Sequence, residues 1–338
     1  MITDPLIVVV HNNNILQILD PKYSYKDENR WNYLIWNSKT RQSINAIAID
    51  YDLHEIIQFT YLHNRYHIVV KNEFAQTCLF TINDLGAFVK LTCDLDTMES
   101  SLKCPVVIHP HIPGYIFANI KRNDEKPLTY ISINDGKYFA PVKLFNHNSS
   151  QPESVKLSLP CSLDTHASFP MPWISIFPES YIGSFQNDVI SMDGGRTWTK
   201  TAFPILKMSS INQGGVVYGI NPDTREFMYS YGSNIWYSLR IFNQNDDIRV
   251  FSHDTKKPTM IINLLVTMPH RNYSLVAHVD FSNILSRTCQ DDDYEYWSPS
   301  STLVKCYEGQ RMVILRIKPN TYCFSNKTYE IEQLTKHC

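Results

Sequence analysis

Short apolar runs rich in Val, Ile, Tyr and Phe recur along the chain, and polar turn residues separate them. In one region the runs Val216–Ile220, Glu226–Ser230 and Trp236–Phe242 follow one another, with Asn221-Pro-Asp-Thr224 between the first two. Such runs are typical of strands joined in an antiparallel meander. No segment shows a clear 3.6-residue period, so the pattern predicts an all-β chain with few helices.

The same arrangement occurs earlier in the chain. The runs Val106–Ile108, Tyr115–Ile120 and Leu128–Ile131 predict a second meander. Only 11 of the 338 residues are glycine. Many turns are therefore expected to use Asn, Asp and Pro instead.

A short repeated motif accompanies these meanders. Ser132-Ile-Asn134-Asp-Gly136-Lys-Tyr-Phe139 and Ser191-Met-Asp193-Gly-Gly195-Arg-Thr-Trp198 share one spacing of hydroxyl, Asn or Asp, Gly and aromatic residues. This is the spacing of the Asp-box, a β-hairpin turn. Its Asn or Asp accepts backbone N–H groups, its Gly supplies a positive φ, and its aromatic ring packs between sheets. Looser copies begin at Thr81, with Asn83 in the acidic position, and at Ser230. The motif is structural and brings no catalytic group.

The spacing of the motifs predicts a β-propeller. The copies begin at residues 81, 132, 191 and 230, and such intervals match a four-stranded blade with its loops. A degenerate start near residues 18–25 and a stretch without a box over residues 258–285 extend the series at both ends. We therefore expect about five or six consecutive four-stranded blades, with every box at a hairpin tip on one face.

A small separate module is expected after residue 288. Beyond Cys289 the strand alternation fades, the acidic run Asp291-Asp-Asp293 appears, and Cys306, Cys323 and Cys338 follow. Clustered cysteines with few periodic apolar residues are typical of a segment held by disulfides rather than by a core. The predicted domains are residues 1–288, which form the blades, and residues 289–338. Inert thiols in a cytosolic protein are the alternative.

Four cysteines precede this segment, and the sequence suggests a partner for two of them. Cys78 and Cys93 lie on either side of the first box, near opposite positions on the two strands that it joins. Such cross-strand neighbours lie ~5.5 Å apart at Cα, within disulfide range. Cys104 and Cys161 remain unassigned.

Charge and hydropathy exclude some classes of function. The chain carries 31 Lys and Arg against 33 Asp and Glu, and it has no strong basic cluster of the kind that nucleic-acid binding requires. No apolar run approaches the ~20 residues that span a bilayer. The first residues also lack the features of a signal peptide. The protein is therefore expected to be cytosolic, or its start is missing.

Residues near the C-terminus resemble a known family. The residues that carry the resemblance are Asp280-Phe281, Ile284-Leu285, Arg287, Cys289, Asp293-Tyr294, Trp297, Cys306, Gly309, Arg316, Lys318 and Cys323. In residue type and spacing they are similar to the start of the cysteine-rich module that follows the ten-bladed propeller of the sortilin family of sorting receptors. The segment Cys161–Ser168 and the box at 191–198 also resemble later blades of that propeller.

This resemblance implies a part of a larger receptor. A ten-bladed ring needs nearly twice this length, so the chain would be the second half of the ring with the beginning of the module. A half-ring would leave the edges of its first and last blades exposed, which favours aggregation. The chain would belong to a type I membrane protein whose transmembrane segment lies outside it. A complete small propeller is the alternative.

The resemblance also implies a function. Family members bind peptide or protein ligands on the lumenal or extracellular side and carry them between Golgi, endosome and plasma membrane, without catalysis and without a cofactor. The family's carboxylate-binding arginine falls near Asn12-Asn-Asn14, where no arginine stands. No ligand-binding residue is therefore named, and neither adaptor nor oligomeric state follows from the sequence.

Two kinds of covalent feature follow from the same resemblance. The family pairing of first with third and second with fourth cysteine implies disulfides from Cys289 to Cys323 and from Cys306 to Cys338. Three N-glycosylation sequons become expected sugar sites under this interpretation, and they are Asn148, Asn272 and Asn326.

Three other sites compete with this interpretation. An Asp-box glycan-binding protein or glycoside hydrolase is the main alternative, but a sialidase needs an arginine triad and here the arginines occur singly. His109-Pro-His111 has a spacing compatible with metal binding, although a loop is expected and no further ligand is evident. Asp291–Asp293 with Glu295 lacks the pattern of a calcium loop, so a solvated acidic turn is expected. The sequence therefore predicts no metal and no catalytic residue.

Overall fold

The computed structural model describes seventeen segments of the chain in enough detail for interpretation. They are residues 7–11, 14–19, 32–37, 42–46, 53–82, 87–97, 104–122, 126–146, 151–161, 168–180, 188–201, 203–232, 235–241, 246–250, 259–268, 273–299 and 311–327. Side chains are described from residue 55 onward, apart from 249 and 250. Within these segments the regular structure is almost entirely strand, as the sequence pattern predicts. None of their helical turns is long and apolar enough to cross a membrane.

The first three sheets each contain four antiparallel strands in sequence order. Blade 1 consists of β1 (Ile7–His11), β2 (Asn14–Leu19), β3 (Asn32–Asn37) and β4 (Gln42–Ala46). Blade 2 consists of β5 (Leu53–Leu62), β6 (Arg65–Asn72), β7 (Thr77–Ile82) and β8 (Phe88–Thr92). Blade 3 consists of β9 (Val106–Ile108), β10 (Ile116–Ile120), β11 (Leu128–Ser132) and β12 (Ala140–Pro141).

The next three sheets continue the series but differ in strand number. Blade 4 has five strands, which are β13 (Lys143–Phe145), β14 (Glu153–Ser154), β15 (Ser175–Pro178), β16 (Asp188–Ser191) and β17 (Thr197–Lys200). Blade 5 has four, which are β18 (Leu206–Ile211), β19 (Val216–Ile220), β20 (Phe227–Ser230) and β21 (Trp236–Leu239). Blade 6 has three described strands, which are β22 (Asp247–Val250), β23 (Ile261–Met268) and β24 (Tyr273–Asp280).

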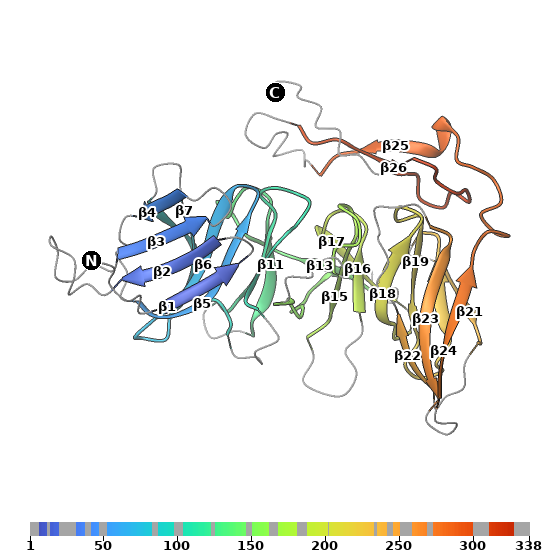
Figure 1. Ribbon diagram of the computed structural model, residues 1–338, viewed down its shortest axis with the longest axis horizontal. Coiled ribbons are helices and arrows are strands. Elements are labelled where there is room, and N and C mark those ends of the chain that lie inside the picture. The colour runs from blue at the N-terminus through green and yellow to red at the C-terminus, as the bar shows by residue number, and fades with distance from the viewer. Residues whose placement is uncertain are drawn as a thin grey trace.

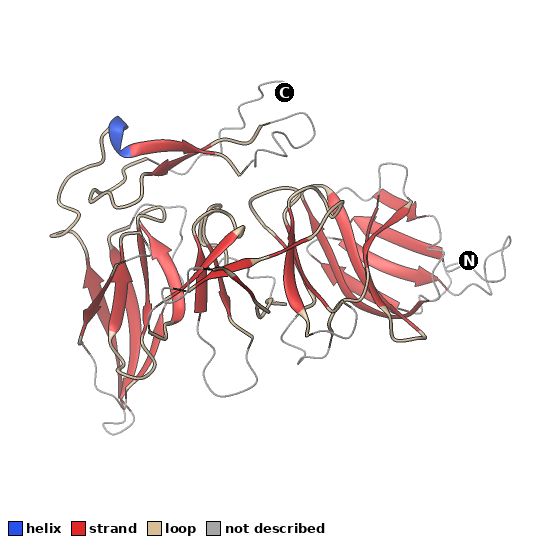
Figure 2. Ribbon diagram, turned by 180° about the vertical axis from the view of Figure 1, so that it is seen from behind, coloured by secondary structure: helices blue, strands red, loops and turns tan. Residues whose placement is uncertain are grey.

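The blades stand one after another, with blade 1 at one end of the molecule and blade 6 at the other (Figures 1 and 2). In blade 4, β13 pairs with β17 in parallel, while the other described strand pairs of the six blades are antiparallel. Consecutive blades of mainly antiparallel strands are the architecture of a β-propeller, so the predicted fold class is confirmed. After blade 6 the chain forms a short 3-10 turn, η3 (Asp291–Asp293), and a two-stranded terminal sheet of β25 (Tyr294–Trp297) and β26 (Ile314–Ile317). The division of the chain into domains at residue 288 stays a proposal.

The box between β16 and β17 forms the predicted hairpin turn. Asp193 Oδ1 accepts the N–H of Thr197 at 2.9 Å, and Ser191 Oγ accepts the N–H of Gly195 at 2.8 Å. Gly195 has a φ of +92°, which a residue with a Cβ rarely adopts. The ring of Trp198 is fully buried, and its Nε1–H donates to the Gly195 carbonyl at 2.8 Å.

The box between β11 and β12 repeats this geometry. Asn134 Oδ1 accepts the N–H of Tyr138 at 3.0 Å, Ser132 Oγ accepts the N–H of Gly136 at 2.8 Å, and Phe139 is buried. The looser copies also lie between consecutive strands, β7–β8 and β20–β21, although Asn83 falls outside the described residues.

Both complete boxes lie at the same end of the blades. The N–H of Asp135 donates to the carbonyl of Gly114 in the β9–β10 loop at 3.1 Å. Gly194, in the other box, borders the rings of that loop, because a Cβ on it would lie 3.1 Å from Ile112 Cδ1 and 3.6 Å from Tyr115 Cε1. We call this side of the blades the box end.

The largest apolar core lies where blades 3, 4 and 5 meet. It includes Phe117 of blade 3 and Phe177 and Trp198 of blade 4, all fully buried. The Phe177 and Trp198 rings stack with centroids 5.1 Å apart, and Phe117 meets Phe177 edge to face at 5.5 Å. The aromatic position of the box therefore joins neighbouring blades, as its motif predicts.

One buried carboxyl group also joins two blades. Asp188 begins β16 and is 8% exposed. Its Oδ2 accepts the N–H of Met208 in blade 5 at 3.3 Å, and its own N–H donates to the Ile205 carbonyl at 3.1 Å. Burial raises the pKa of Asp188 from 3.8 to about 6, because a low-dielectric site disfavours the charged form.

This pKa shift predicts a pH-dependent effect of Asp188→Asn. Above pH 6 the Asp188 carboxyl is charged in the folded and in the unfolded state, so burying the charge destabilises the fold. As the pH falls from 6 to 3.8, the folded state binds a proton before the unfolded state does, and this destabilisation disappears. Asparagine keeps an acceptor for the Met208 N–H. We expect it to raise the free energy of unfolding by on the order of 1–3 kcal/mol near pH 7.5 and by clearly less near pH 5. Urea unfolding at both pH values measures this, and an equal effect at both would contradict it.

Candidate functional site at the junction of the blades and the cysteine-linked segment

The chain after blade 6 folds back across the box end of the blades. We call residues 287–327 the cysteine-linked segment, of which 287–299 and 311–327 are described. Figure 1 shows β25 and β26 lying across the ends of blades 4 and 5. Side chains alternate along a strand, and both faces of this sheet contact the blades. Ile317, on the face opposite to Trp297, borders the β18–β19 turn of blade 5, because a Cβ on Gly215 would lie 3.3 Å from its Cδ1.

The face that carries Trp297 joins the core of the blades through apolar side chains. Trp297 and the fully buried Ile314 belong to the same core as blades 3, 4 and 5. The Trp297 ring meets Trp173 of blade 4 edge to face, with centroids 6.4 Å apart. Beside them, Arg316 pairs with Glu295 at 2.6 Å and donates to the Met192 carbonyl at 3.2 Å. The segment thus shares a hydrophobic core with the blades.

Two amide side chains of blade 5 bind the backbone of the segment. Asn212, in the β18–β19 turn, is 1% exposed. Its Nδ2 donates to the Cys323 carbonyl and its Oδ1 accepts the N–H of Ser325, both at 2.8 Å. The next residue, Gln213, accepts from Ser325 Oγ at 2.8 Å and donates to the Lys327 carbonyl. These bonds fix the segment on the turn.

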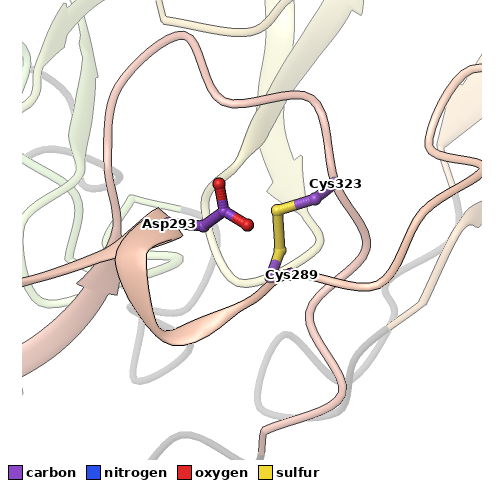
Figure 3. Close-up of side chains that lie close together, drawn as sticks. All are labelled: Cys289, Asp293 and Cys323. Atoms are coloured by element: carbon purple, nitrogen blue, oxygen red, sulfur yellow. A yellow bond between two sulfur atoms is a disulfide. The ribbon is translucent and has the colours of Figure 1, made fainter.

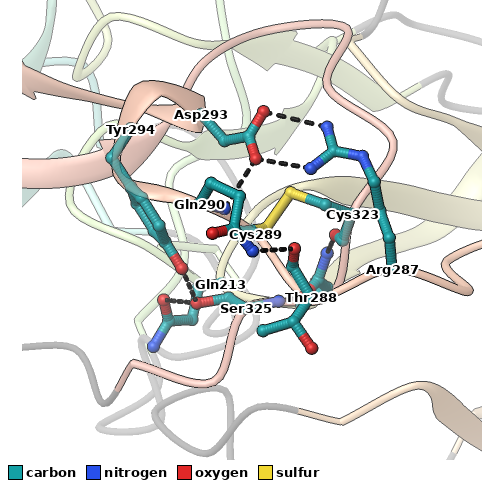
Figure 4. Close-up of a disulfide and its surroundings, with 10 residues drawn as sticks. Gln213, Arg287, Thr288, Cys289, Gln290, Asp293, Tyr294, Cys323 and Ser325 are labelled. Carbon is teal, nitrogen blue, oxygen red and sulfur yellow. Dashed lines mark hydrogen bonds and ion pairs between the residues drawn. A yellow bond between two sulfur atoms is a disulfide. The ribbon is translucent and has the colours of Figure 1, made fainter.

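On the other face, the disulfide between Cys289 and Cys323 closes the segment (Figure 3). Asp293 lies beside it and receives a bidentate ion pair from Arg287, at 2.6 and 2.9 Å, and the N–H of Gln290 at 2.7 Å (Figure 4). The Arg287 hydrogen bond, followed by that of Gln290, lowers the pKa of Asp293 to about 2. Asp293 therefore stays ionised throughout the physiological pH range.

Three possible metal-ligand atoms gather here, from Cys289, Asp293 and Cys323, within 4.8 Å of one another. The two sulfur atoms are bonded to each other, and the carboxylate is held by Arg287. A disulfide sulfur is not a thiolate, which is the form of cysteine that binds metals. The disulfide and the Asp293–Arg287 ion pair hold the loop in place, and these groups offer no chemistry for catalysis.

The acidic run was expected to be a solvated turn, and the structure corrects this in part. Asp293 pairs with Arg287, and Asp291 pairs with Lys327 at 2.9 Å. Lys327 also lies over the Tyr294 ring, 4.4 Å from its centroid. The two basic partners, Arg287 and Lys327, lie outside the run itself, so its sequence alone does not reveal the pairing.

The expectation that disulfides rather than a core hold this segment is also corrected. Tyr294, Ile317 and the two cysteines form a small cluster of their own, while Trp297 and Ile314 join the core of the blades. The apolar residues are few and give no periodic signal, because each contributes to one of two separate contacts.

The described cysteines form three disulfides. Cys78 pairs with Cys93 across β7 and β8, with 4.0 Å between their Cα atoms, and Cys289 pairs with Cys323; these are the partners expected from the sequence. Cys104, which the sequence left unassigned, pairs with Cys161. Cys306 and Cys338 lie outside the described residues, and their pairing stays a prediction.

Of the three expected glycosylation sites, Asn326 is exposed next to the buried Ser325. Asn148 and Asn272 lie outside the described residues. Sugar attachment at each of them remains a prediction.

The histidines of the His109-Pro-His111 loop bind backbone groups. His109 is fully buried, and its Nδ1 accepts the N–H groups of His111 and Ile112, both at 3.1 Å. His111 Nε2 bonds the Phe169 carbonyl of blade 4 at 3.0 Å, and His63 Nε2 of blade 2 bonds the His109 carbonyl at 2.7 Å. The loop expected from the sequence is thus a connection across three blades.

Removing the disulfide is expected to loosen the segment and leave the blades folded. Cys289→Ser with Cys323→Ser opens a loop of 34 residues, for which chain entropy predicts a loss of ~3–4 kcal/mol. Amide hydrogen exchange of β25 and β26 should accelerate, while that of β19 should not. The matched control is Cys78→Ser with Cys93→Ser, which should leave β25 and β26 protected. Equal acceleration in β19 would contradict this prediction.

Comparison with known proteins extends these observations. The family model described as "Sortilin, neurotensin receptor 3, C-terminal" matches residues 253–338. Vacuolar protein sorting/targeting protein 10 of Paracoccidioides lutzii is 23% identical over 316 residues, covering 86% of this chain and 21% of that protein. Sortilin of Danio rerio is 22% identical over 257 residues, covering 67% of this chain and 31% of that protein. The chain thus spans between about a fifth and a third of these relatives.

Solved structures match only loosely. The β-propeller domain of the Trilobed protease from Pyrococcus furiosus aligns with a TM-score of 0.33 and 9% identity, over 82% of this chain and 81% of that one. The family model over residues 253–338 and the curated relatives support the resemblance of this chain to the sortilin family.

Proposed function

We propose that this chain is the ligand-binding lumenal portion of a sortilin-like sorting receptor that captures peptide or protein ligands for transport between Golgi and endosome. The observation that carries the proposal is the match of residues 253–338 to the sortilin C-terminal model. The relatives are named for protein sorting and targeting. In this proposal the blades are the second half of a ten-bladed ring, and blades 1 and 6 meet the rest of that ring.

In this proposal the blades recognise peptide or protein ligands and catalyse no reaction. Extended peptides bind β-proteins by adding a strand to a free sheet edge, where backbone hydrogen bonds give affinity and side-chain pockets give specificity. An arc of separate blades offers several such edges. The cysteine-linked segment would hold blades 3, 4 and 5 at a fixed angle, because it binds the turn at Asn212 and shares their core.

A glycan-binding or glycoside-hydrolase propeller is the second candidate, since Asp-boxes occur there as well. Such a site would need arginines gathered around one carboxylate. Five described arginines instead have separate local partners, which are Asp135 for Arg65, Tyr130 for Arg122, Asp193 for Arg196, Asp293 for Arg287 and Glu295 for Arg316. Purified protein is expected not to hydrolyse sialosides, and turnover abolished by a single carboxylate substitution would favour the enzyme.

Gene disruption in the source organism tests the sorting function. Loss of a sorting receptor should divert its ligands to the default secretory route, so hydrolases of the vacuole or lysosome should increase in the culture medium. Complementation with the intact gene should restore retention, and a bulk secreted protein that needs no receptor serves as the control. An unchanged secretome would contradict the proposal.

A further inference from the structure

One side of the fourth strand of blade 5 is apolar and uncovered. Four large apolar residues occupy alternate positions on β21 and beside its two ends, and each of them is between 41% and 64% exposed. They are Ile235, Tyr237, Leu239 and Ile241. Alternate residues of an extended chain point to the same side, and we call these four residues the β21 strip. The opposite side of the strand is covered, because the Trp236 ring meets that of Phe203 edge to face at 6.4 Å.

The β21 strip lies on the side of blade 5 that faces blade 6. Tyr237 is paired with Tyr229 in the register of blade 5, and their rings stack at 5.3 Å. Tyr229 also meets Phe281, which directly follows β24, at 5.3 Å. Leu239 is paired with Phe227, which belongs to the core between blades 5 and 6. Directly paired residues of neighbouring strands share one face of the sheet, and Figure 1 shows blades 5 and 6 side by side.

The core between blades 5 and 6 stops short of the β21 strip. This core contains side chains from β18, β19 and β20 of blade 5 and from β22, β23 and β24 of blade 6, but none from β21. Consecutive blades pack face to face, so each strand lies opposite the strand in the same position of the next blade. The fourth position of blade 6 holds no strand among the described residues. The β21 strip is therefore exposed because its counterpart is missing.

The outer edge of β24 has the chemistry of an edge that is normally covered. In the described part of the sheet β24 pairs only with β23. Its eight residues, Tyr-Ser-Leu-Val-Ala-His-Val-Asp, include no Lys, Arg or Pro. Exposed edge strands are usually short or carry Lys or Pro, which prevents pairing with other chains. The outermost strands of blades 2 and 3 follow this rule, since β8 contains Lys90 and the two residues of β12 include Pro141.

We propose that a fourth strand from a part of the same receptor outside residues 1–338 completes blade 6. This strand pairs with the outer edge of β24 through its backbone and covers the β21 strip with apolar side chains at alternate positions. It extends the core between blades 5 and 6 without a break. The inference rests on the proposed function, in which this chain is one portion of a longer receptor; the chain covers 21% and 31% of the two curated relatives described above.

The chemistry of the edge favours a permanent strand over two other occupants. A ligand peptide would leave β24 open whenever no ligand is bound, and this edge lacks the Lys or Pro that would then protect it. A second copy of the chain could pair its own β24 with this edge. The apolar face of that β24, with Leu275 and Val279, is however already packed on its own blade 5, so it could not cover the β21 strip.

Amide hydrogen exchange of Leu275–Val279 tests the proposal. It is measured in the secreted chain and in the full-length receptor produced from the intact gene. The amides at the outer edge should exchange more slowly in the receptor, by about tenfold or more. Leu239→Lys should abolish this protection, while Phe74→Lys, at an 82% exposed position in the β6–β7 turn, should preserve it. Because both positions are exposed, neither variant should change the unfolding midpoint of the secreted chain. Equal exchange in chain and receptor would overturn the proposal.

Photocrosslinking identifies the occupant. A photoreactive phenylalanine analogue replaces Tyr237 in the full-length receptor, and mass spectrometry maps the product. We expect a crosslink to one segment of the same polypeptide outside residues 1–338. A crosslink to a second copy, to a co-purified protein or to a segment within these residues would overturn the proposal, and so would a yield no higher than that of the same analogue at Phe74.

The gene disruption described above remains an independent test of sorting. Diverted hydrolases together with unprotected β24 would refute the fourth strand and leave the sorting function supported. An unchanged secretome together with a protected β24 and the expected crosslink would refute the sorting function and leave the fourth strand supported.

Discussion

Asn212→Ala is expected to release the cysteine-linked segment from blade 5. The substitution leaves the Cys323 carbonyl and the Ser325 N–H buried without their partner, and each such group costs ~1–3 kcal/mol. Asn212 also has a φ of +51°, a conformation that asparagine tolerates better than alanine. We therefore expect the segment to lose about 2–6 kcal/mol of local stability. Amide hydrogen exchange of Tyr294–Trp297 measures it directly.

Two further variants make this prediction specific. Asn212→Asp keeps the acceptor for Ser325 and loses the donor to Cys323, so its effect should be intermediate. Asn221→Ala removes a side chain that caps the β19–β20 turn through the N–H groups of Asp223 and Thr224, and it should destabilise blade 5 without freeing β25. Unchanged exchange of Tyr294–Trp297 in Asn212→Ala would show that the shared core alone holds the segment.

Gly195→Ala is expected to destabilise the junction of blades 3 and 4 by about 2–6 kcal/mol. A Cβ at this position would lie 2.3 Å from Phe117 Cζ, closer than packed atoms tolerate, and overpacking of a core costs ~1–3 kcal/mol. The φ of +92° adds ~1–3 kcal/mol of backbone strain. Denaturant unfolding monitored by tryptophan fluorescence reports the change, because Trp198 is in the same box.

Graded controls within the boxes test the reason for this loss. At Gly136 the obstacle is Leu91 Cδ1, 2.7 Å away, at the end of a flexible side chain, so Gly136→Ala should cost less than Gly195→Ala. Thr197→Ala changes an exposed residue of the same box and should cost under ~1 kcal/mol. If all three variants have equal effects, the close approach to Phe117 is not the cause.

Features with local causes could be predicted from the sequence. The strands at Val106–Ile108 and Val216–Ile220 appear as predicted, because alternation of apolar residues and turn chemistry act over a few positions. The two complete boxes form their turns for the same reason. Cys78 and Cys93 could be paired because a hairpin register places them opposite each other.

Features that depend on the arrangement of blades could not be predicted. The disulfide between Cys104 and Cys161 spans 57 residues, and no hairpin register relates its ends. In the sequence Asn212 resembles an ordinary turn residue, yet its side chain binds the backbone carbonyl of Cys323, 111 residues further along the chain. The burial of such a polar turn residue can be recognised only in the folded structure, where its binding partner covers it.

The contacts of Trp297 and Ile314 with the blades could not be predicted either. Trp297 and Ile314 gave no periodic signal, because they flank a gap of sixteen residues and meet the blades from separate strands. Their burial depends on the box end of blades 3, 4 and 5, whose residues come much earlier in the chain. The resemblance to the sortilin module identified Trp297 as a family position but not its contact with the blades.

Direct binding of a diverted ligand tests the central claim, that this chain is the ligand-binding part of a sortilin-like receptor. A hydrolase found in the medium after gene disruption is purified and titrated into the secreted, disulfide-bonded chain in a calorimeter, with an unrelated secreted protein as the control. The account predicts saturable binding with one ligand per chain that is lost on reduction of the disulfides. No heat of binding with intact chain, for any hydrolase that the disruption diverts, would contradict it.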